Sequence, residues 1–321
     1  MKSPLRMTLA VTSALTLVTG CSLLNASPPV PDDWTPRGSV SALVAFAPGG
    51  GSDRSARVVA QGLNELEAGF DVNVENKEGG SGAVGWATFL AEKGNGNALL
   101  VAETALNTLP IVYDVPFTYR DFTPLVMFAE DSRIVVAGKD SPYRTCADLV
   151  EAGGKKAVKT GSSGKTGADS LVVAEFEKNG GTFAVVPYGS TGEVLTGLLG
   201  GQIEVAPASA ASARPYLESG DFKALCTLTD ERYDDAVLGD VPTAKEQGVD
   251  AEVTIWRGVL APGDIAPVQR EYWTKAIRES MRSDTYRDYI KTDLLIPADV
   301  SGADFDRYLD TYDRQMQEVF K

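Results

Sequence analysis

Histidine is absent from this 321-residue sequence. It is the usual general base beside a nucleophilic serine or cysteine, and it is the commonest metal ligand. Its absence excludes Ser-His-Asp and Cys-His catalytic sites, together with every metal site that needs a histidine ligand. Catalysis by carboxylates, as in glycosidases, stays open because Asp and Glu are abundant, but no pair of these residues stands out in the sequence.

Positive charge is also scarce, because 30 Lys and Arg residues face 44 Asp and Glu residues and leave a formal net charge of −14. Nucleic acids and anionic membrane surfaces require clustered positive charge, so neither is an expected partner. Any anionic ligand therefore has to be held by a local arrangement of hydrogen-bond donors or positive charges. The length and the hydrophobic content of 43% suit one large domain or two of ordinary size.

One apolar run, residues 7–18, lies in the setting of an export signal. It follows a positively charged start, is too short to span a membrane as an ordinary helix, and precedes small residues. The sequence VTGC that ends at Cys21 resembles a bacterial lipobox. We therefore expect residues 1–21 to be a lipoprotein signal peptide, residues 22–38 to be a tether, and the protein to be extracytoplasmic, anchored to the cell membrane through a lipidated Cys21. The alternative is a buried cysteine after a fortuitous apolar run.

Cysteine is rare, with three residues in the chain. Besides Cys21 there are Cys146 and Cys226, an even pair in an oxidising compartment, where disulfides persist. Two interpretations stay open, a disulfide between them or two small buried thiols.

Strand-like and helix-like segments alternate from Ser39 onward. The expected strands are residues 40–46, 71–75, 98–102, 133–137, 156–160, 182–186, 203–206, 223–228 and 252–260. Helices are expected between most of them, for example at residues 145–152, 168–178 and 192–199. The chain ends in helices, one beginning at Pro267 and a last one with an apolar face of Phe305, Tyr308, Leu309, Tyr312, Met316 and Val319. The alternation predicts an α/β fold with largely parallel sheets, whose ligands bind beyond the carboxyl ends of the strands.

The segment LVAFAPGGGSDRSAR, residues 43–57, joins an expected strand to an expected helix through three glycines. Glycines let backbone N–H groups face outward, and the first turn of a helix adds unpaired N–H groups and the positive end of its dipole. Such a loop suits an anion. The alternative interpretation is a tight turn in which Ser52 caps the helix.

A second loop, TGSSGKTG at residues 160–167, repeats this geometry between a strand and a helix. Its GKT ending is similar to a Walker A loop, but that motif requires glycine where Lys159 stands, so nucleotide hydrolysis is not expected. The segment GSGAVG at residues 80–85 fits a dinucleotide-binding pattern. Because it follows the second expected strand rather than the first, we expect its glycines to let a helix start close against the sheet.

Several segments, taken in order, resemble the extracytoplasmic binding component of tripartite tricarboxylate transporters, the TctC or Bug family of type II periplasmic binding proteins. They are AFAPGGGSD, VNVENKEGGSGAVGW, KTGSSGKTG, VVPYGSTGEVLTGLLGGQIEV, DVPTAKEQGVD and TIWRGVLAPG. The similarity spans residues 39–321, and the ordered set is more specific than any single motif.

The resemblance implies a two-lobed solute-binding protein with no catalysis and no cofactor, in which two mixed, mostly parallel sheets flank a ligand cleft. Lobe one would contain residues 39–137 and 251–321, and lobe two residues 138–250. In the family a small organic acid is held mainly by backbone amides of the two glycine loops and by water, with little help from Arg or Lys. The implied ligand is a di- or tricarboxylate, or an acidic or amino-acid-like monoacid, and the implied partners are the membrane components of a tripartite transporter.

Matching positions give the residues that the resemblance assigns to ligand binding. They are Pro48, Gly49, Gly50, Gly51, Ser52 and Asp53 in lobe one, Gly161, Ser162, Ser163, Gly164, Lys165 and Thr166 in lobe two, and Glu103, Thr104, Asn107 and Ser209 from two further loops. The chain departs from the family pattern at Thr166-Gly167 and at Gly189, beside the expected pocket. Glu103 would repel one carboxylate if it faced the cleft. The competing interpretations are a surface sensor or scaffold without a transport role, and a secreted hydrolase that uses carboxylates.

Overall fold

The structure, a computed structural model, describes residues 30–163 and 165–320. The expected signal peptide, Cys21, most of the expected tether and Gly164 lie outside the described residues. Within the described part, no helix combines the length and the apolar character needed to cross a membrane.

The described residues form a regular succession of strands and helices. The strands are β1 (Gly38–Val44), β2 (Phe70–Asn76), β3 (Ala98–Glu103), β4 (Phe122–Gly138), β5 (Val158–Ser162), β6 (Phe183–Pro187), β7 (Val205–Ser209), β8 (Phe222–Thr227), β9 (Thr254–Pro262) and β10 (Ile296–Ser301). The α-helices are α1 (Gly51–Asn64), α2 (Ala83–Phe89), α3 (Ala105–Val112), α4 (Cys146–Lys155), α5 (Ala168–Lys178), α6 (Thr191–Leu199), α7 (Ala210–Glu218), α8 (Pro267–Ser280), α9 (Asp284–Thr292) and α10 (Ala303–Phe320).

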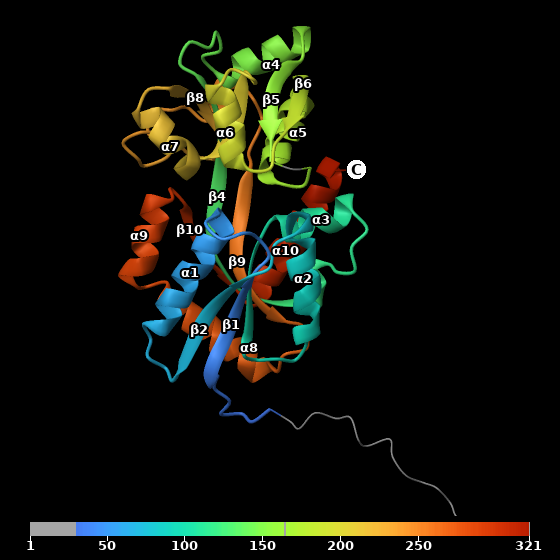
Figure 1. Cartoon of the computed structure of the whole chain (residues 1–321), viewed down its shortest axis with the longest axis vertical. Helices are drawn as coiled ribbons and strands as arrows, with labels where there is room; N and C mark the ends of the chain where they lie inside the picture. The colour runs from blue at the N-terminus through green and yellow to red at the C-terminus, as the bar shows by residue number, and fades with distance from the viewer. Residues whose placement is uncertain (1–29, 164, 321) are drawn as a thin grey trace, which may run out of the picture.

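Two groups of elements stand one above the other and are joined by the long strands β4 and β9 (Figure 1). The first lobe has the strand order β2-β1-β3-β9-β4, with β10 also on β4, and the second has β4-β7-β5-β6, with β8 also on β4. β4 therefore belongs to both sheets. Its residue Ser132 pairs with Thr254 of β9, whereas the next residue, Arg133, pairs with Ser209 of β7. The residue limits predicted for the two lobes stay a prediction.

The predicted α/β fold is confirmed, but its pairing is less parallel than expected. Parallel pairing is confined to β1 with β2 and β3, and to β5 with β6 and β7. The described pairs that include β4 or β9 are antiparallel. The chain enters the second lobe along β4 and returns along β9, so these two neighbours must run in opposite directions.

Most predicted elements lie within a few residues of their expected limits. α5 has the predicted limits, α8 begins at Pro267, and α10 buries four residues of its predicted apolar face. The prediction missed β10 and the first part of β4. β10 has no buried residue and therefore shows no apolar pattern, whereas the first part of β4 holds a buried apolar run at residues 125–129 that the polar Glu130-Asp131-Ser132 separates from the predicted strand.

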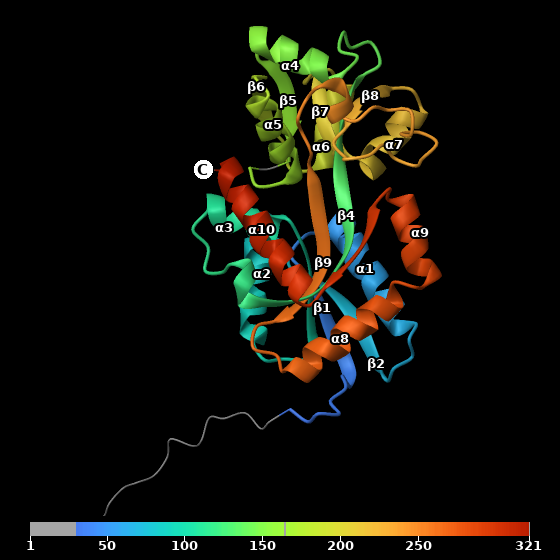
Figure 2. The same ribbon diagram turned by 180° about the vertical axis from the view of Figure 1, so that it is seen from behind.

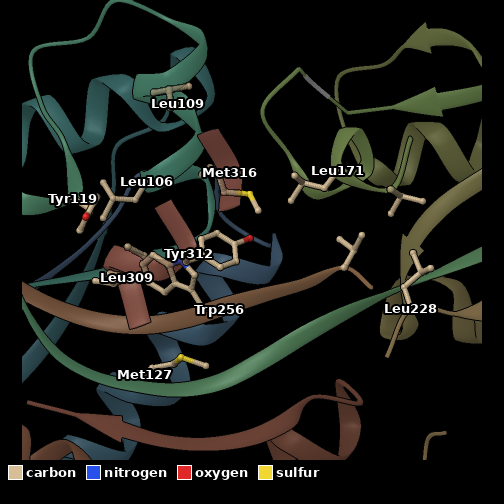
Figure 3. Packing of buried hydrophobic residues seen from close by; sticks show 14 of the residues in the cluster. Leu106, Leu109, Tyr119, Met127, Leu171, Leu228, Trp256, Leu309, Tyr312 and Met316 are labelled. Atoms are coloured by element: carbon tan, nitrogen blue, oxygen red, sulfur yellow. The ribbon is translucent and has the colours of Figure 1, made fainter. Parts of the chain in front are cut away.

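The helix α10 lies in the foreground of Figure 2, beside β9, and its carboxyl-terminal end reaches the second lobe. The apolar cluster beneath it spans both lobes, with Trp256 of β9 and Met316 of α10 near Leu171 of α5 (Figure 3). Full burial of an apolar side chain stabilises the fold by about 1.5–3 kcal/mol. The lobes are therefore held together by shared core packing as well as by the two crossing strands.

A disulfide joins Cys146, the first residue of α4, to Cys226 in β8, with a Cα–Cα distance of 5.7 Å. Both side chains are fully buried. The bridge connects residues 80 positions apart and ties α4 to a strand of the second lobe. The structure therefore contains the disulfide, and the alternative of two small buried thiols is wrong.

Candidate functional site

A cavity of about 490 Å³ lies between the two lobes and is lined by residues of both. The amino-terminal ends of α1, α5 and α6 face it, through Gly50, Gly51, Ser52, Gly167, Ala168, Ser190 and Thr191. The first N–H groups of a helix have no partner inside the helix, and they carry the positive end of its dipole. The cavity therefore suits an anion.

The first glycine loop leads from β1 into α1 and presents Gly50, Gly51 and Ser52 to the cavity. The N-cap of α1 is Gly50, so the alternative interpretation in which Ser52 caps the helix is wrong. Pro48 and Gly49 precede the lining residues without joining them. Gly49 has a φ of 87°, a left-handed conformation that favours glycine.

Asp53 anchors this loop and does not line the cavity. Its carboxylate accepts hydrogen bonds from the Gly49 N–H (2.9 Å), the Arg57 guanidinium (2.9 and 3.0 Å) and the Asn76 amide (2.9 Å). Burial alone would raise the pKa of Asp53, but these hydrogen bonds outweigh burial and lower the pKa to about 2. Asp53 is therefore ionised in the folded protein at neutral pH and fixes the path of the loop.

The second glycine loop presents Ser163 and Thr166 to the cavity and ends at Gly167, the N-cap of α5. Asp169, in the first turn of α5, accepts hydrogen bonds from the Ser163 N–H (3.1 Å) and hydroxyl (2.7 Å). The Thr166 carbonyl accepts a hydrogen bond of 2.8 Å from the Thr108 hydroxyl on α3. This contact links the two lobes next to the cavity.

Three other predicted residues of this loop do not line the cavity. Gly161 and Ser162 belong to the end of β5, where a Cβ on Gly161 would lie 2.6 Å from the Val194 side chain on α6. Glycine at this position is thus required for close packing of β5 and α6. Lys165 is exposed, and it too lies outside the cavity lining.

The remaining predicted site residues fall into two groups. Glu103, the last residue of β3, lines the cavity. Thr104 and Asn107 are buried away from the lining, where they accept hydrogen bonds of 3.1 Å from the Tyr312 hydroxyl and from the Trp256 indole N–H. Ser209 is the N-cap of α7 and accepts a hydrogen bond from the N–H of Ser212 (3.2 Å). These three side chains support the walls of the site.

Many of the residues that line the cavity were not predicted from the sequence to bind a ligand. They are Ala45, Phe46, Ala47, Glu78, Gly79, Ser81, Gly82, Ala105, Arg133, Gly167, Ala168, Gly189, Ser190, Thr191, Ile255 and Arg257. The two arginines differ most from the expectation of a site with little help from Arg or Lys. The sequence contained a signal for both arginines. Each is a charged residue at or within an apolar strand, and a charge in such a place requires a partner.

The glycines of residues 80–85 serve close packing, as predicted. A Cβ on Gly85 would lie 2.7 Å from the Ala45 Cα and from the Lys77 carbonyl oxygen. Gly82 has a φ of 105°, and a Cβ there would lie 2.6 Å from the Trp86 ring. These glycines allow α2 to start against β1 and the strand end after β2.

Arg257 on β9 forms the floor of the cavity beneath α1. Its guanidinium donates to the Asp131 carboxylate (2.5 Å) and to the Ser55 hydroxyl (3.3 Å), and a Cβ on Gly51 would lie 2.8 Å from its Nη2. Burial alone would lower the pKa of Arg257, but the charge and hydrogen bond of Asp131 raise it. Burial raises the pKa of Glu103, which pairs in register with Arg257, and the Arg257 charge opposes that shift.

In residues 30–163 and 165–320, no group of three or more Cys, Asp or Glu side chains is arranged to hold a metal ion. Among the residues that line the cavity, Arg133 and Arg257 carry positively charged side chains.

Comparisons with known proteins agree with this fold. The sequence model of the family described as "Tripartite tricarboxylate transporter family receptor" matches residues 55–319. The "UPF0065 protein in the TAR-I ttuE-ttuC' intergenic region" of Agrobacterium vitis is 31% identical over 258 residues, which cover 78% of this chain and 73% of the relative.

Two solved structures are similar to the whole described chain. A TctC solute binding protein from Polaromonas, solved with no ligand, is 25% identical with a TM-score of 0.74, and the match covers 88% of this chain and 98% of that one. An R. palustris protein solved with adipate is 23% identical with a TM-score of 0.79, covering 89% and 97%, and this similarity shows the fold. The family match covers most of the chain, so the chain belongs to the tripartite tricarboxylate transporter receptor family of periplasmic solute-binding proteins.

Proposed function

We propose that this protein is an extracytoplasmic solute-binding lipoprotein that captures a small organic carboxylate between its lobes and delivers it to the membrane components of a tripartite transporter. The observation that carries the proposal is the convergence of the amino-terminal ends of α1, α5 and α6 on one cavity. A carboxylate in that cavity would accept hydrogen bonds from backbone N–H groups that lack partners within their helices.

The ligand-binding residues in this proposal are those predicted positions that line the cavity. They are Gly50, Gly51, Ser52 and Glu103 in the first lobe and Ser163 and Thr166 in the second. The volume of about 490 Å³ lies within the range of small-molecule sites, roughly 300–1,000 Å³. The adipate bound by the structurally similar R. palustris protein supports a small carboxylic acid as the ligand class.

The anchoring part of the proposal rests on the VTGC sequence at Cys21. Replacing Cys21 by Ser is expected to abolish lipid attachment and to leave the folded domain unchanged, because β1 starts well after this residue. Partition of the wild type and the variant between detergent and water measures the effect. A Cys21→Ser protein that still enters the detergent phase would contradict lipidation at this site.

A thermal-shift screen of the mature domain tests carboxylate binding. The panel contains mono-, di- and tricarboxylates and amino acids of two to eight carbons, and the control for each acid is its neutral amide. An acid at a hundred times its dissociation constant should add about 2.7 kcal/mol to the free energy of unfolding. NMR of each bound acid after prolonged incubation should show no chemical change. A panel in which no acid raises the melting temperature would contradict the proposal.

A further inference from the structure

Arg133 is a partly buried cation whose guanidinium makes no hydrogen bond in the described part of the chain. Its side chain is 12% exposed, and its Nε has neither a partner nor contact with solvent. The nearest carboxylate oxygens are 3.8 Å away in Asp131 and 3.9 Å away in Asp169, beyond hydrogen-bond distance. A guanidinium has five N–H donors, and one of them, the Nε–H of Arg133, is buried and unpaired, which is costly.

The two nearby aspartates already accept hydrogen bonds from other residues. Asp131 Oδ2 accepts the short hydrogen bond from Arg257, so Arg257 holds the carboxylate that Arg133 only approaches. Asp169 Oδ2 accepts two hydrogen bonds from Ser163, and its Oδ1 has no partner. Arg257 is therefore held by hydrogen bonds to Asp131 and Ser55, although its Nε lacks a partner, whereas Arg133 makes only two long ion pairs and no hydrogen bond.

The position of Arg133 places those donors in the cavity. It lines the cavity, and it is the residue at which β4 leaves the sheet of the first lobe and joins that of the second. Its neighbour Asp169 lies in the first turn of α5, so the guanidinium stands beside the N-terminus of that helix. An anion at this point would meet a guanidinium and a helix N-terminus together.

We propose that Arg133 receives the carboxylate of the ligand and makes the site select a charged acid over its neutral amide. The inference rests on the proposed function and goes beyond it, because it assigns the main contact to a side chain rather than to backbone amides. A carboxylate accepts two parallel hydrogen bonds from a guanidinium, which supplies the missing partners of Arg133. Asp131 and Asp169 balance the two arginines and Glu103 lines the same cavity, so the helix N-termini have to offset the added negative charge of the ligand.

The test measures how strongly each variant distinguishes an acid from its amide. The probes are adipate, 6-aminohexanoate, succinate and 4-aminobutanoate, each paired with the compound in which every carboxylate is a primary amide. Isothermal titration calorimetry gives the dissociation constants for the wild type and for Arg133→Gln, Arg133→Lys and Arg270→Gln. Arg270 is the matched control, because it is a half-buried, ion-paired arginine on α8 outside the cavity lining.

Arg133→Gln should weaken binding of every acid that the wild type binds by about 10- to 100-fold and leave amide binding unchanged, so the preference for acid over amide collapses. Arg133→Lys should retain part of the preference, because Lys keeps the charge but not the fork of donors. Arg270→Gln should bind like the wild type. A purely structural role of Arg133 would weaken acids and amides alike.

Two outcomes separate the two proposals. If the wild type binds acids and Arg133→Gln keeps both the affinity and the preference, the Arg133 assignment is wrong while the proposed function stands. If the wild type binds none of the acids in the screen, the proposed function fails and the assignment fails with it. Should Arg133→Gln not fold, the Nε–H signal of Arg133 in ¹⁵N NMR of the wild type decides, because it should shift with the acid and not with the amide.

Discussion

The two glycine loops look alike in sequence but are anchored differently. In both, an aspartate in the first turn of the following helix binds the loop. Asp53 in the first lobe is fully paired, with hydrogen bonds from Gly49, Arg57 and Asn76. Asp169 in the second lobe binds Ser163 through one oxygen, and its other oxygen makes no hydrogen bond but only a long ion pair of 3.9 Å with Arg133. The first loop is therefore a completed structural unit, whereas the second leaves charged groups that a ligand can pair.

The difference arises from what surrounds each aspartate. Asp53 finds its cation four residues later on its own helix, so its charge is balanced locally. Asp169 faces an arginine from the strand β4, which also approaches Asp131. The aspartate of the first loop is therefore balanced by a cation of its own segment, whereas the aspartate of the second loop depends on an arginine from a distant strand. Five experiments test this difference between the lobes.

The largest effect is expected from the disulfide of the second lobe, which has no counterpart in the described first lobe. Replacing Cys146 and Cys226 by Ser should lower the free energy of unfolding by about 4 to 5 kcal/mol, because the unfolded chain regains the entropy of a long loop. Denaturant titration without reductant measures the loss. The matching check is a thiol count on the denatured, non-reduced mature chain, where two free thiols would contradict the bridge.

The next effect concerns the anchor of the first loop. Asp53→Ala should lower stability by about 2–4 kcal/mol, because four hydrogen bonds to a charged and buried carboxylate are lost. Asp169→Ala is the matched variant, and it should cost less stability because Ser163 alone donates to it. Equal losses for the two variants would show that the loops are anchored alike.

Asp53 also predicts how the stability of the protein changes at acidic pH. Because the folded pKa of Asp53 lies below its ordinary value of 3.8, its contribution to stability is complete above that value. It is lost as the pH falls from about 4 toward the folded pKa of about 2. Thermal unfolding of the wild type and Asp53→Ala over this range should show the two converging.

A smaller effect is expected from adding a methyl group to each loop. A Cβ on Gly51 would lie 2.8 Å from the Arg257 guanidinium, which cannot move freely because Asp131 and Ser55 hold it. A Cβ on Gly167 would meet no atom within 4 Å. Gly51→Ala should therefore cost about 1–2 kcal/mol of stability, and Gly167→Ala less than about 0.5 kcal/mol. Similar costs at both positions would contradict the close contact of α1 with Arg257.

The smallest effect is expected at Glu103. Burial raises its pKa in the folded protein above the ordinary value of 4.5, so stability is lost as the pH rises from that value through the folded pKa. Glu103→Gln should stabilise the protein by less than about 1 kcal/mol at pH 7.5, and the gain should vanish below about pH 4, where the carboxyl is neutral in both states. A variant that is less stable than the wild type at pH 7.5 would show that the attraction to Arg257 outweighs burial.

The sequence by itself determined the local units of this protein. Gly50-Gly51 and Gly167 lead into α1 and α5 because glycines permit the turn and apolar residues then recur at helical spacing, and both are properties of neighbouring residues. Pro267 marked the start of α8, and the apolar face of α10 was readable for the same reason. These patterns were enough to predict the α/β fold and the two loops that face the cavity.

Only the tertiary structure decided which of those residues meet. It buried Thr104 and Asn107 against Tyr312 and Trp256, made Asp53 an anchor, and brought Arg133, Asp131 and Arg257 together beside two helix N-termini. It also made β4 and β9 antiparallel neighbours shared between the lobes. Contacts between residues more than a hundred positions apart depend on strand register and packing across the whole fold, and no local spacing in the chain encodes them.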